Sequence, residues 1–371
     1  MKARQALLPE VGGKFEILES EVPSPKTGEL VVRQELCGVC ATDAHMWQGR
    51  LPGVAYPIVL GHEPIGVIEA LGPGIDTDSG GRKVAVGDRV YVAPGIYCGR
   101  CYFCFRLREP TLCEFATGIG FNPDPDRPEL RGGWSEYMLL DHPRQTFLKF
   151  EGVDAQTGVF LEPLCVGIHA FERISVRAGD VVVIQGAGAV GMGALIAAQE
   201  SGAFRTIVIG APSTRLELAR SLGADVTIDI EDEPDPQRRA DLVRAETTHG
   251  FGADVVVECT GSPGSVREGI ELLRRGGTYV VAGHFTDRGS VELNPFTHMN
   301  NNQVSIHGVW GNDIAHFIQA LPILESARYA TADIVSHRVG LERVEDVCLA
   351  MTGDYRLDGE QIRKVAIEAA L

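Results

Sequence analysis

The feature that most constrains the fold is an alternation of short apolar runs and helix-like segments that begins at residue 180. DVVVIQ is followed by GAGAVG and a helical stretch to residue 201, and then by TIVIGAP, RLELARSLG, ADVTIDI, ADVVVECTG, VREGIELLRRGG and TYVVAG. The apolar runs carry no polar face, which predicts a parallel sheet with helices on both sides. We interpret the acidic, proline-rich residues 231–239 as a solvated connection within this domain.

The chain before residue 160 has a different pattern of apolar and turn-forming residues. Short β-like runs such as ELVVRQEL, PIGVIEAL and DRVYVAP alternate with glycine and proline turns, which predicts an antiparallel, β-rich domain. From about Trp310 the elements are mixed, and we expect them to pack back onto this first domain. The length of 371 residues favours two domains.

Charge and apolar segments exclude several classes of function. The net charge is −16 and no block of Lys and Arg occurs, so nucleic acid is not an expected partner. The N-terminus has no apolar segment of signal-peptide length, which indicates a cytoplasmic protein. Residues 181–198 are nearly apolar, but four glycines and a glutamine interrupt them. They predict a buried strand, a turn and a helix, and no membrane association.

A glycine motif follows the first strand of the alternating region. Gly186, Gly188 and Gly191 form GxGxxG between a strand and a helix, with Ala189 and Val190 inside it. The first glycine permits a tight turn, the second lets backbone approach a pyrophosphate, and the third lets helix pack on strand. The motif therefore predicts a dinucleotide-binding site.

The choice of dinucleotide depends on the end of the second strand. An acidic residue that binds the adenosine ribose is expected there, but Gly210 occupies the position. Ser213, Thr214 and Arg215 follow and could bind a 2′-phosphate. The cofactor is NAD or NADP, and these residues slightly favour NADP.

Four closely spaced cysteines predict a metal site. The chain has nine cysteines, and an odd number in a long cytoplasmic chain favours metal binding over a disulfide framework. Four of them form C-x2-C-x2-C-x8-C, which is typical of a tetrahedral zinc site. Four thiolates close the coordination sphere, so this zinc would be structural; an iron–sulfur cluster is the alternative. The four are Cys98, Cys101, Cys104 and Cys113.

A second set of possible ligands comes from separate segments. CGVCATDAH (residues 37–45) contains Cys40, GHEP contains His62 and Glu63, and LEPL contains Glu162. Cysteine, histidine and carboxylate from three segments predict a zinc site with an open position, which is the catalytic arrangement. Each residue alone would more often be an ordinary buried group, and we expect this of Cys37.

The combined motifs resemble those of zinc-dependent medium-chain alcohol dehydrogenases, closest in ligand pattern to polyol and sugar dehydrogenases. GVCATDAH, GHEPIG, VGDRV, the cysteine lobe, GGWSEY, LEPL and GAGAVG occur in the family's order. The resemblance implies an α/β chain with a GroES-like β-barrel catalytic domain and a Rossmann domain. We expect the catalytic domain at 1–166, with the zinc lobe at about 95–115, the Rossmann domain at 167–308, and a return to the catalytic domain at 309–371.

The resemblance also implies roles for individual residues. Thr42 would contact the substrate oxygen, Asp43 would orient the zinc-binding histidine, and His45 would relay protons to solvent. Glu63 would lie beside the zinc and could bind it directly. Residues expected to contact the dinucleotide are Arg215, Thr260, Ala282, Gly283 and Arg363. The cysteine lobe is one residue longer than usual before its last cysteine, and residues 71–90 form an unusually long loop.

These features predict an enzyme with two zinc ions per chain. It would transfer hydride between an alcohol (a secondary alcohol, polyol or sugar) and a nicotinamide, giving a ketone or aldehyde. A homodimer or homotetramer is expected from the resemblance. The alternatives are a zinc-independent quinone or enoyl reductase of the same superfamily, which would lack the zinc motifs, and a non-catalytic nucleotide-binding redox sensor.

Overall fold

The structure is a computed structural model that describes residues 1–121 and 125–371. The chain forms two compact units. Residues 1–162, 312–328 and 332–371 make the first unit, and residues 163–311 and 329–331 make the second. The helix α3 (Leu161–Glu172) contains the change from the first unit to the second, a few residues before the boundary expected from sequence.

The first unit is built mainly from short strands. In its N-terminal part these are β1 (Lys2–Leu8), β2 (Glu16–Glu21), β3 (Leu30–Gly38), β4 (Ile58–Val59), β5 (Glu63–Leu71), β6 (Arg89–Val92), β7 (Gly95–Ile96), β8 (Thr117–Gly118), β9 (Tyr137–Leu140) and β10 (Phe147–Lys149). The helices there are α1 (Ala41–Trp47), η1 (Tyr102–Leu107), η2 (Pro110–Leu112) and α2 (Ala155–Gly158). The C-terminal part adds α8 (Ile314–Glu325), η4 (Thr331–Ile334, whose first residue belongs to the second unit), β17 (Val335–Val339), η5 (Leu341–Arg343), α9 (Val344–Thr352), β18 (Arg356–Leu357), β19 (Glu360–Gln361) and β20 (Lys364–Ile367).

The main sheet of this unit joins the two ends of the chain. Its strand order is β10-β6-β5-β3-β20-β17, with β9 also paired to β3. Most pairs are antiparallel, and β17 and β20 are parallel. The register sets Gly38 of β3 opposite Glu63 of β5 and opposite Ala366 of β20. The sheet therefore brings three distant segments together at the end of β3.

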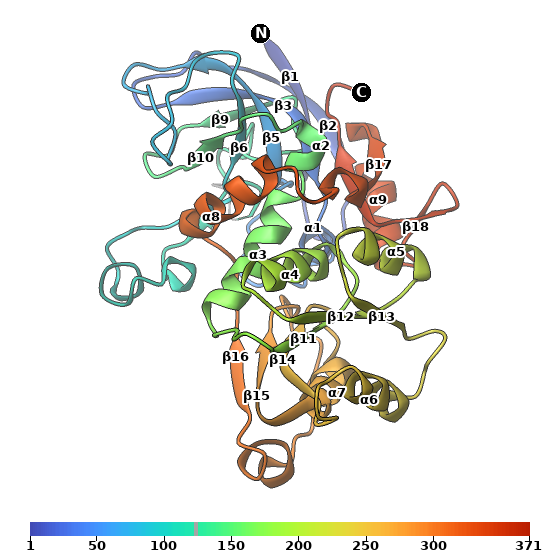
Figure 1. The fold of residues 1–371 in the computed structure, drawn as a ribbon. Helices are drawn as coiled ribbons and strands as arrows, with labels where there is room; N and C mark the ends of the chain where they lie inside the picture. The colour runs from blue at the N-terminus through green and yellow to red at the C-terminus, as the bar shows by residue number, and fades with distance from the viewer. Residues whose placement is uncertain (122–124) are drawn as a thin grey trace. The chain divides into compact units, whose positions relative to one another are not determined.

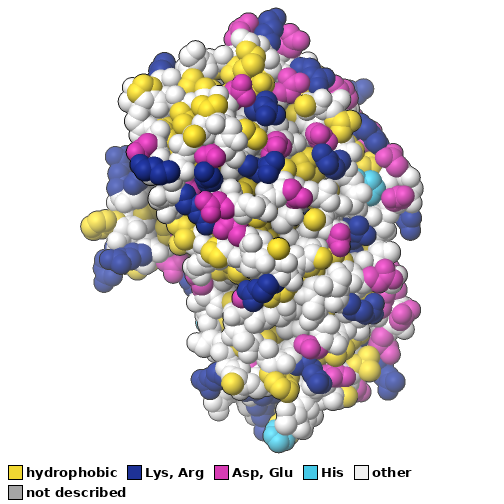
Figure 2. Space-filling model, turned by 45° about the horizontal axis from the view of Figure 1, so that its top comes forward, with side chains coloured by type: hydrophobic (Ala, Val, Ile, Leu, Met, Phe, Trp, Pro, Cys, Tyr) yellow, Lys and Arg dark blue, Asp and Glu magenta, His cyan; other side chains and the backbone are white. Residues whose placement is uncertain are grey.

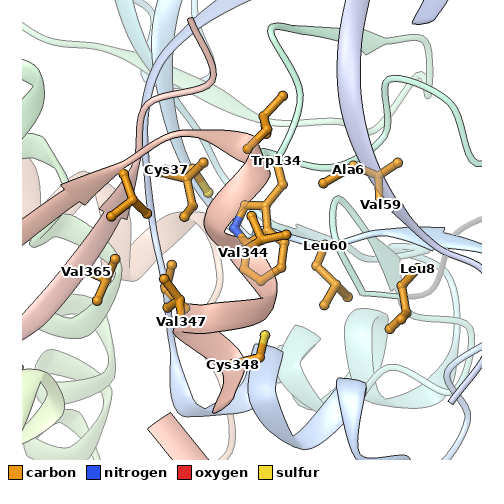
Figure 3. Packing of buried hydrophobic residues seen from close by; sticks show 14 of the residues in the cluster. Ala6, Leu8, Cys37, Val59, Leu60, Trp134, Val344, Val347, Cys348 and Val365 are labelled. Carbon is orange, nitrogen blue, oxygen red and sulfur yellow. The ribbon is translucent and has the colours of Figure 1, made fainter. Parts of the chain in front are cut away.

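A buried apolar cluster supports this end of the sheet. Figure 3 shows Trp134 among Cys37, Leu60, Val344 and Cys348, all of which are fully or almost fully buried. Helix α9 packs against α1 in the same region. Cys37 therefore lies in the core, and the segment that follows it is anchored on packed side chains.

The second unit is a six-stranded parallel sheet with the order β13-β12-β11-β14-β15-β16 (Figure 1). Helices α4 and α5 cover one face, and α6 and α7 cover the other. The strands and helices are β11 (Val181–Gln185), α4 (Ala189–Glu200), β12 (Arg205–Gly210), α5 (Ser213–Ser221), β13 (Val226–Asp229), α6 (Pro236–Ala245), β14 (Ala253–Glu258), α7 (Pro263–Leu272), β15 (Leu273–Val281), η3 (Phe296–Asn300) and β16 (Ser305–Gly308). The strand order reverses at β11, and the predicted doubly wound sheet is confirmed.

One element within this unit was predicted wrongly. Residues 231–239 were expected to be a connection, but helix α6 begins at Pro236. The side chain of Asp235 accepts a hydrogen bond from the backbone N–H of Gln237 and caps the helix, and Pro236 takes the first helical position. An aspartate before a proline is a helix-start signal, and the acidic composition masked it.

Charged side chains of both signs are mixed over the face shown in Figure 2. In the described part of the chain, no helix is long and apolar enough to cross a membrane. The long loop at residues 71–90 is ordered around Asp78, whose buried carboxylate accepts hydrogen bonds from the backbone N–H groups of Gly80, Arg82 and Lys149.

Candidate active site

Cys40, His62 and Glu63 come together at the end of β3. Cys40 precedes helix α1, and His62 and Glu63 stand where β5 begins. One ligand atom from each of the three lies within 4.8 Å of the others. His62 and Glu63 are buried and Cys40 is half-buried. A thiolate, an imidazole and a carboxylate at this spacing form a donor set that suits Zn²⁺.

Asp43 connects two of these residues. Its Oδ2 accepts a hydrogen bond from the backbone N–H of Cys40 at 2.8 Å, and its Oδ1 lies 3.1 Å from Nδ1 of His62. Burial is the largest single influence and would lower the pKa of His62, but the charges and hydrogen bonds of Asp43 and Cys40 together outweigh it and the pKa is raised. With Nδ1–H donating to Asp43, Nε2 of His62 is left for a metal.

Glu63 is paired with a buried lysine. Nζ of Lys364, the first residue of β20, lies 2.6 Å from Oε2 of Glu63. Both side chains are buried. Burial is the largest single influence and would lower the pKa of Lys364, but Glu63, Cys40 and Glu162 together raise it, so the ammonium stays charged. A Cβ on Gly38 would lie 1.9 Å from Oε2 of Glu63, so only glycine leaves room for this pair.

Glu162 lies outside the group of three described ligand atoms but belongs to the same electrostatic cluster. Its Oε1 accepts a hydrogen bond from Nδ2 of Asn312 at 2.6 Å. Tyr97 in turn donates its hydroxyl to the backbone oxygen of Asn312 at 2.6 Å. Burial raises the pKa of Glu162, and the charge of Glu63 raises it further. Asn312 therefore fixes the direction of this carboxylate.

The residues present fit a divalent cation. Oε1 of Glu63 is buried and has no hydrogen-bond partner among the described residues, which is costly unless a further ligand binds there. Three negative charges meet here, on the Cys40 thiolate and on the carboxylates of Glu63 and Glu162. The positive charges of the Lys364 ammonium and of one divalent cation would together balance them. The donor set and the charge therefore both support a zinc ion at this position.

The remaining residues expected to act on the substrate lie on helix α1. The hydroxyl of Thr42 is buried and lies 3.5 Å from Sγ of Cys40. His45 is half-buried, one turn further along the helix. Thr42 is thus placed beside the metal ligands, and His45 lies nearer to solvent.

The four cysteines of the lobe also come together. One sulfur atom from each lies within 4.8 Å of the other three. The backbone N–H of Cys101 points at Sγ of Cys98 at 3.3 Å, and that of Cys98 at Sγ of Cys113 at 3.4 Å. Hydrogen bonds, first from the backbone N–H of Arg100 and then from that of Cys101 and from neighbouring cysteines, outweigh burial and lower the pKa of Cys98 to about 6. Thiolates held by backbone N–H groups fit a tetrahedral zinc ion with no open position.

The glycine motif in the second unit forms a turn that fits a pyrophosphate. Gly186 has φ +108°, and a Cβ on Gly191 would lie 1.8 Å from the backbone oxygen of Gly186. A Cβ on Gly188 would meet nothing within 4 Å among the described residues. Gly188 is the N-cap residue of helix α4, and no described side chain caps the helix. The helix N-terminus is thus open to an anion.

Gly210 cannot be replaced by an acidic residue on this backbone. A Cβ at this position would lie 2.8 Å from both N and Cβ of Ala187. Helix α5 starts at Ser213, and its first turn has no acidic residue. Thr214 and Arg215 follow in that turn. The steric restriction explains why the expected ribose-binding acid is absent.

The other expected cofactor residues lie in two places. Thr260, Ala282 and Gly283 follow β14 and β15 of the second unit, where strands of this sheet present their carboxyl ends. Arg363 precedes β20 in the first unit, and its Nε is buried without a hydrogen-bond partner among the described residues.

Sequence reasoning missed Lys364 and Asn312. Each contacts an expected ligand from a segment that is distant in the chain. One signal was present for Lys364, since a lysine that opens the apolar strand KVAI needs a buried partner. No local pattern marked Asn312.

Comparisons with known proteins place both parts of the chain in known families. The family described as Alcohol dehydrogenase GroES-like domain matches residues 26–150, and the family described as Zinc-binding dehydrogenase matches residues 189–326. The chain is 34% identical to 5-exo-hydroxycamphor dehydrogenase of Pseudomonas putida, over 92% of this chain and 93% of that protein. It is 32% identical to sorbitol dehydrogenase of Halalkalibacterium halodurans, over 88% and 89% respectively.

A solved structure is similar over the whole chain. Alcohol dehydrogenase from Thermotoga maritima superimposes with a TM-score of 0.92 at 31% identity, and all of both chains is covered. The GroES-like and Rossmann fold expected from sequence is thereby confirmed. The fold, the matched families and the full-length relatives agree, and the chain belongs to the zinc-dependent medium-chain alcohol dehydrogenases.

Proposed function

We propose that this protein is an NAD(P)-dependent zinc dehydrogenase that interconverts a secondary alcohol, of the polyol or sugar type, and the corresponding carbonyl compound. The observation that carries the proposal is the meeting of Cys40, His62 and Glu63 beside the buried carboxylate of Glu162. A carboxylate at position 162 and the similarity to a sorbitol dehydrogenase favour polyols.

The residues of the first unit would bind the substrate and move its proton. When bound, zinc supplies Lewis-acid stabilisation of the substrate oxygen, and the nicotinamide accepts or donates the hydride. Cys40, His62 and Glu162 would hold the zinc, with Glu63 as a further ligand. Thr42 would accept the hydroxyl proton of the alcohol while it gives up its own hydroxyl proton towards His45. His45 would then release a proton to solvent, a step that suits an imidazole near neutral pH. Asp43 keeps His62 in the orientation that binding requires.

We assign the cysteine lobe to a second zinc ion with a structural role, giving two per chain. We also propose that NADP is the preferred cofactor. Gly210 leaves no acidic group that would repel a 2′-phosphate, and Ser213, Thr214 and Arg215 in the first turn of α5 can bind one.

The assembly and the compartment are part of the proposal. Strand β16 ends the parallel sheet, and Ile306 on it is 38% exposed, which supports pairing between copies in a homodimer or homotetramer. The structure joins none of the nine cysteines in a disulfide, and four of them form the cysteine lobe, which supports a reducing compartment such as the cytoplasm.

The test combines a substrate screen with one substitution. Purified protein is assayed with a panel of polyols, sugars and other secondary alcohols and both nicotinamides, and its zinc content is measured. Cys40→Ser should abolish turnover and leave binding of the dinucleotide unchanged, because the glycine motif is intact. Cys37→Ala, three residues away in the core, is the matched control and should remain active. Normal turnover by Cys40→Ser would contradict the proposal.

A further inference from the structure

Glu258 is a fully buried carboxylate that the proposed reaction does not use. It is the last residue of β14, at the carboxyl end of the parallel sheet, and its exposed fraction is 0%. A carboxylate is almost never fully buried unless its oxygens are satisfied. Its partners therefore indicate what it does.

One oxygen of Glu258 organises the turn after β14. Oε1 accepts hydrogen bonds from the backbone N–H and the hydroxyl of Thr260, both at 2.6 Å, and from the backbone N–H of Gly261 at 2.7 Å. The hydroxyl of Ser265 approaches the same oxygen at 3.2 Å. Gly261 has φ +65°, so the turn is in a conformation that glycine favours and the carboxylate holds.

The other oxygen reaches the turn after β15. Oε2 accepts a hydrogen bond from the backbone N–H of Gly283 at 3.3 Å and lies 3.7 Å from Nε2 of His284. The backbone oxygen of Glu258 also accepts from Ala282 and Gly283 at 2.9 Å each. A Cβ on Gly283 would lie 2.5 Å from the backbone N of Gly261, so the two turns are in close contact.

The strand order places these turns on one side of the dinucleotide site. The pyrophosphate turn follows β11, which lies between β12 and β14. A dinucleotide crosses a sheet of this kind where the strand order reverses. The adenosine half belongs to the end of β12, where Gly210 lies. The nicotinamide half then belongs to the ends of β14 and β15, where Glu258 ties the two turns together.

We propose that Glu258 is a positioning residue for the nicotinamide half of the cofactor. Its carboxylate fixes the turns Thr260–Gly261 and Gly283–His284 as one preformed surface, so that the ring is bound without the cost of ordering two flexible turns. The proposal rests on the proposed function, because it requires a nicotinamide dinucleotide in this unit.

The experiment separates the two halves of the cofactor. Dissociation constants are measured by calorimetry for NADPH and NADH, and for 2′-phospho-ADP-ribose and ADP-ribose, which lack nicotinamide. Glu258→Ala should raise the constant for the reduced dinucleotide by about tenfold, the size expected for lost hydrogen bonds to a charged group. Binding of the nicotinamide-free compounds should change less than about twofold.

Two further variants keep the test decisive. Glu258→Gln has the same shape and can keep Oε1 as an acceptor, but it turns an N–H towards Gly283. It should give a smaller increase of about threefold, as for one neutral hydrogen bond. Asp254→Asn is the matched control, because Asp254 lies near the start of the same strand and accepts from the backbone N–H of Val181. This variant should leave unchanged the ratio between the dissociation constant of the dinucleotide and that of its nicotinamide-free counterpart.

The outcomes distinguish the two levels of the proposal. If the wild-type protein binds none of the four compounds, the proposed function is wrong and the role of Glu258 is wrong with it. The other case is a wild-type protein that binds a dinucleotide and its nicotinamide-free counterpart (NADPH with 2′-phospho-ADP-ribose, or NADH with ADP-ribose). If the Glu258 variants then weaken the binding of both compounds equally, or of neither, only the positioning role is wrong.

Discussion

The two groups of candidate metal ligands in the first unit are built in different ways. The cysteine lobe takes its ligands from residues 98–113 and stabilises them with backbone N–H groups of the same segment. Cys40, His62, Glu63 and Glu162 come from three segments. Asp43 of the Cys40 segment and two residues from distant parts of the chain, Lys364 and Asn312, hold them. A site with four thiolates needs no further support. In a metal site with an open coordination position, fewer protein ligands surround the ion. Buried hydrogen-bond and ion-pair partners must then keep the charged ligand side chains in their orientation.

The largest expected effect tests the local character of the cysteine lobe. Cys101→Ser should lower the zinc content from two ions per chain to one, and the free energy of unfolding should fall by several kcal/mol, because structural zinc contributes directly to folding. Metal analysis and denaturant titration measure both. Phe105→Ala is the control, since this side chain is 78% exposed in the same lobe and should change neither quantity. Two zinc ions in Cys101→Ser would show that the lobe is not a zinc site.

The next effect tests the buried ion pair. Lys364→Met leaves the carboxylate of Glu63 buried without its cation, and the unfolding free energy of the zinc-free protein should fall by about 3 to 5 kcal/mol. The loss should be smaller with zinc bound, because the metal can take the place of the ammonium. Lys83→Met breaks an exposed pair with Asp76, and its unfolding free energy should stay close to that of the wild type, because solvent screens exposed ion pairs. Equal losses in the two variants would contradict a special role for Lys364.

The same contrast explains what could be predicted from sequence. The ligands of the lobe and the glycine motif are local in the chain, so spacing alone indicates them. Cys40, His62 and Glu63 were expected from residue types in separate motifs, and the structure brings them together. Lys364 and Asn312 lie about 300 and 150 residues from their partners. Their contacts depend on the register of β20 beside β3 and on the return of the chain after residue 311, which no local pattern reveals.

In the second unit, too, some elements could be predicted from the sequence and one could not. The parallel sheet followed from apolar strands that alternate with helices, because this period reflects burial on both faces. The start of α6 was missed because its acidic residues suggested solvent, although Asp235 and Pro236 form a cap. Composition described the exposure of most of that segment, but not its backbone conformation or the burial of Arg239, which pairs with Glu268.

A third prediction concerns the orientation of His62. In Asp43→Asn an amide N–H replaces one of the two acceptor oxygens, so either His62 or the backbone N–H of Cys40 loses its partner. The zinc affinity of this site should fall by about 10- to 100-fold, as for other partners of metal-binding histidines. A competition assay with a chromophoric chelator measures it. Asp78→Asn is the control, because Asp78 is buried and accepts backbone N–H groups far from the ligands in the chain. An equal loss in both would indicate a general effect on folding.

The smallest expected effect concerns the direction of Glu162. Asn312→Ala removes the amide that donates to Oε1 of Glu162, and zinc affinity should fall by only about threefold, as for one hydrogen bond of ordinary strength. The same amide lowers the pKa of Glu162 against the stronger effect of burial, so this pKa should rise further in the variant. Tyr97→Phe removes the hydroxyl that holds Asn312 and should have a still weaker effect in the same direction. If Asn312→Ala leaves the affinity unchanged while Asp43→Asn lowers it, then support by buried partners extends to the histidine but not to this carboxylate.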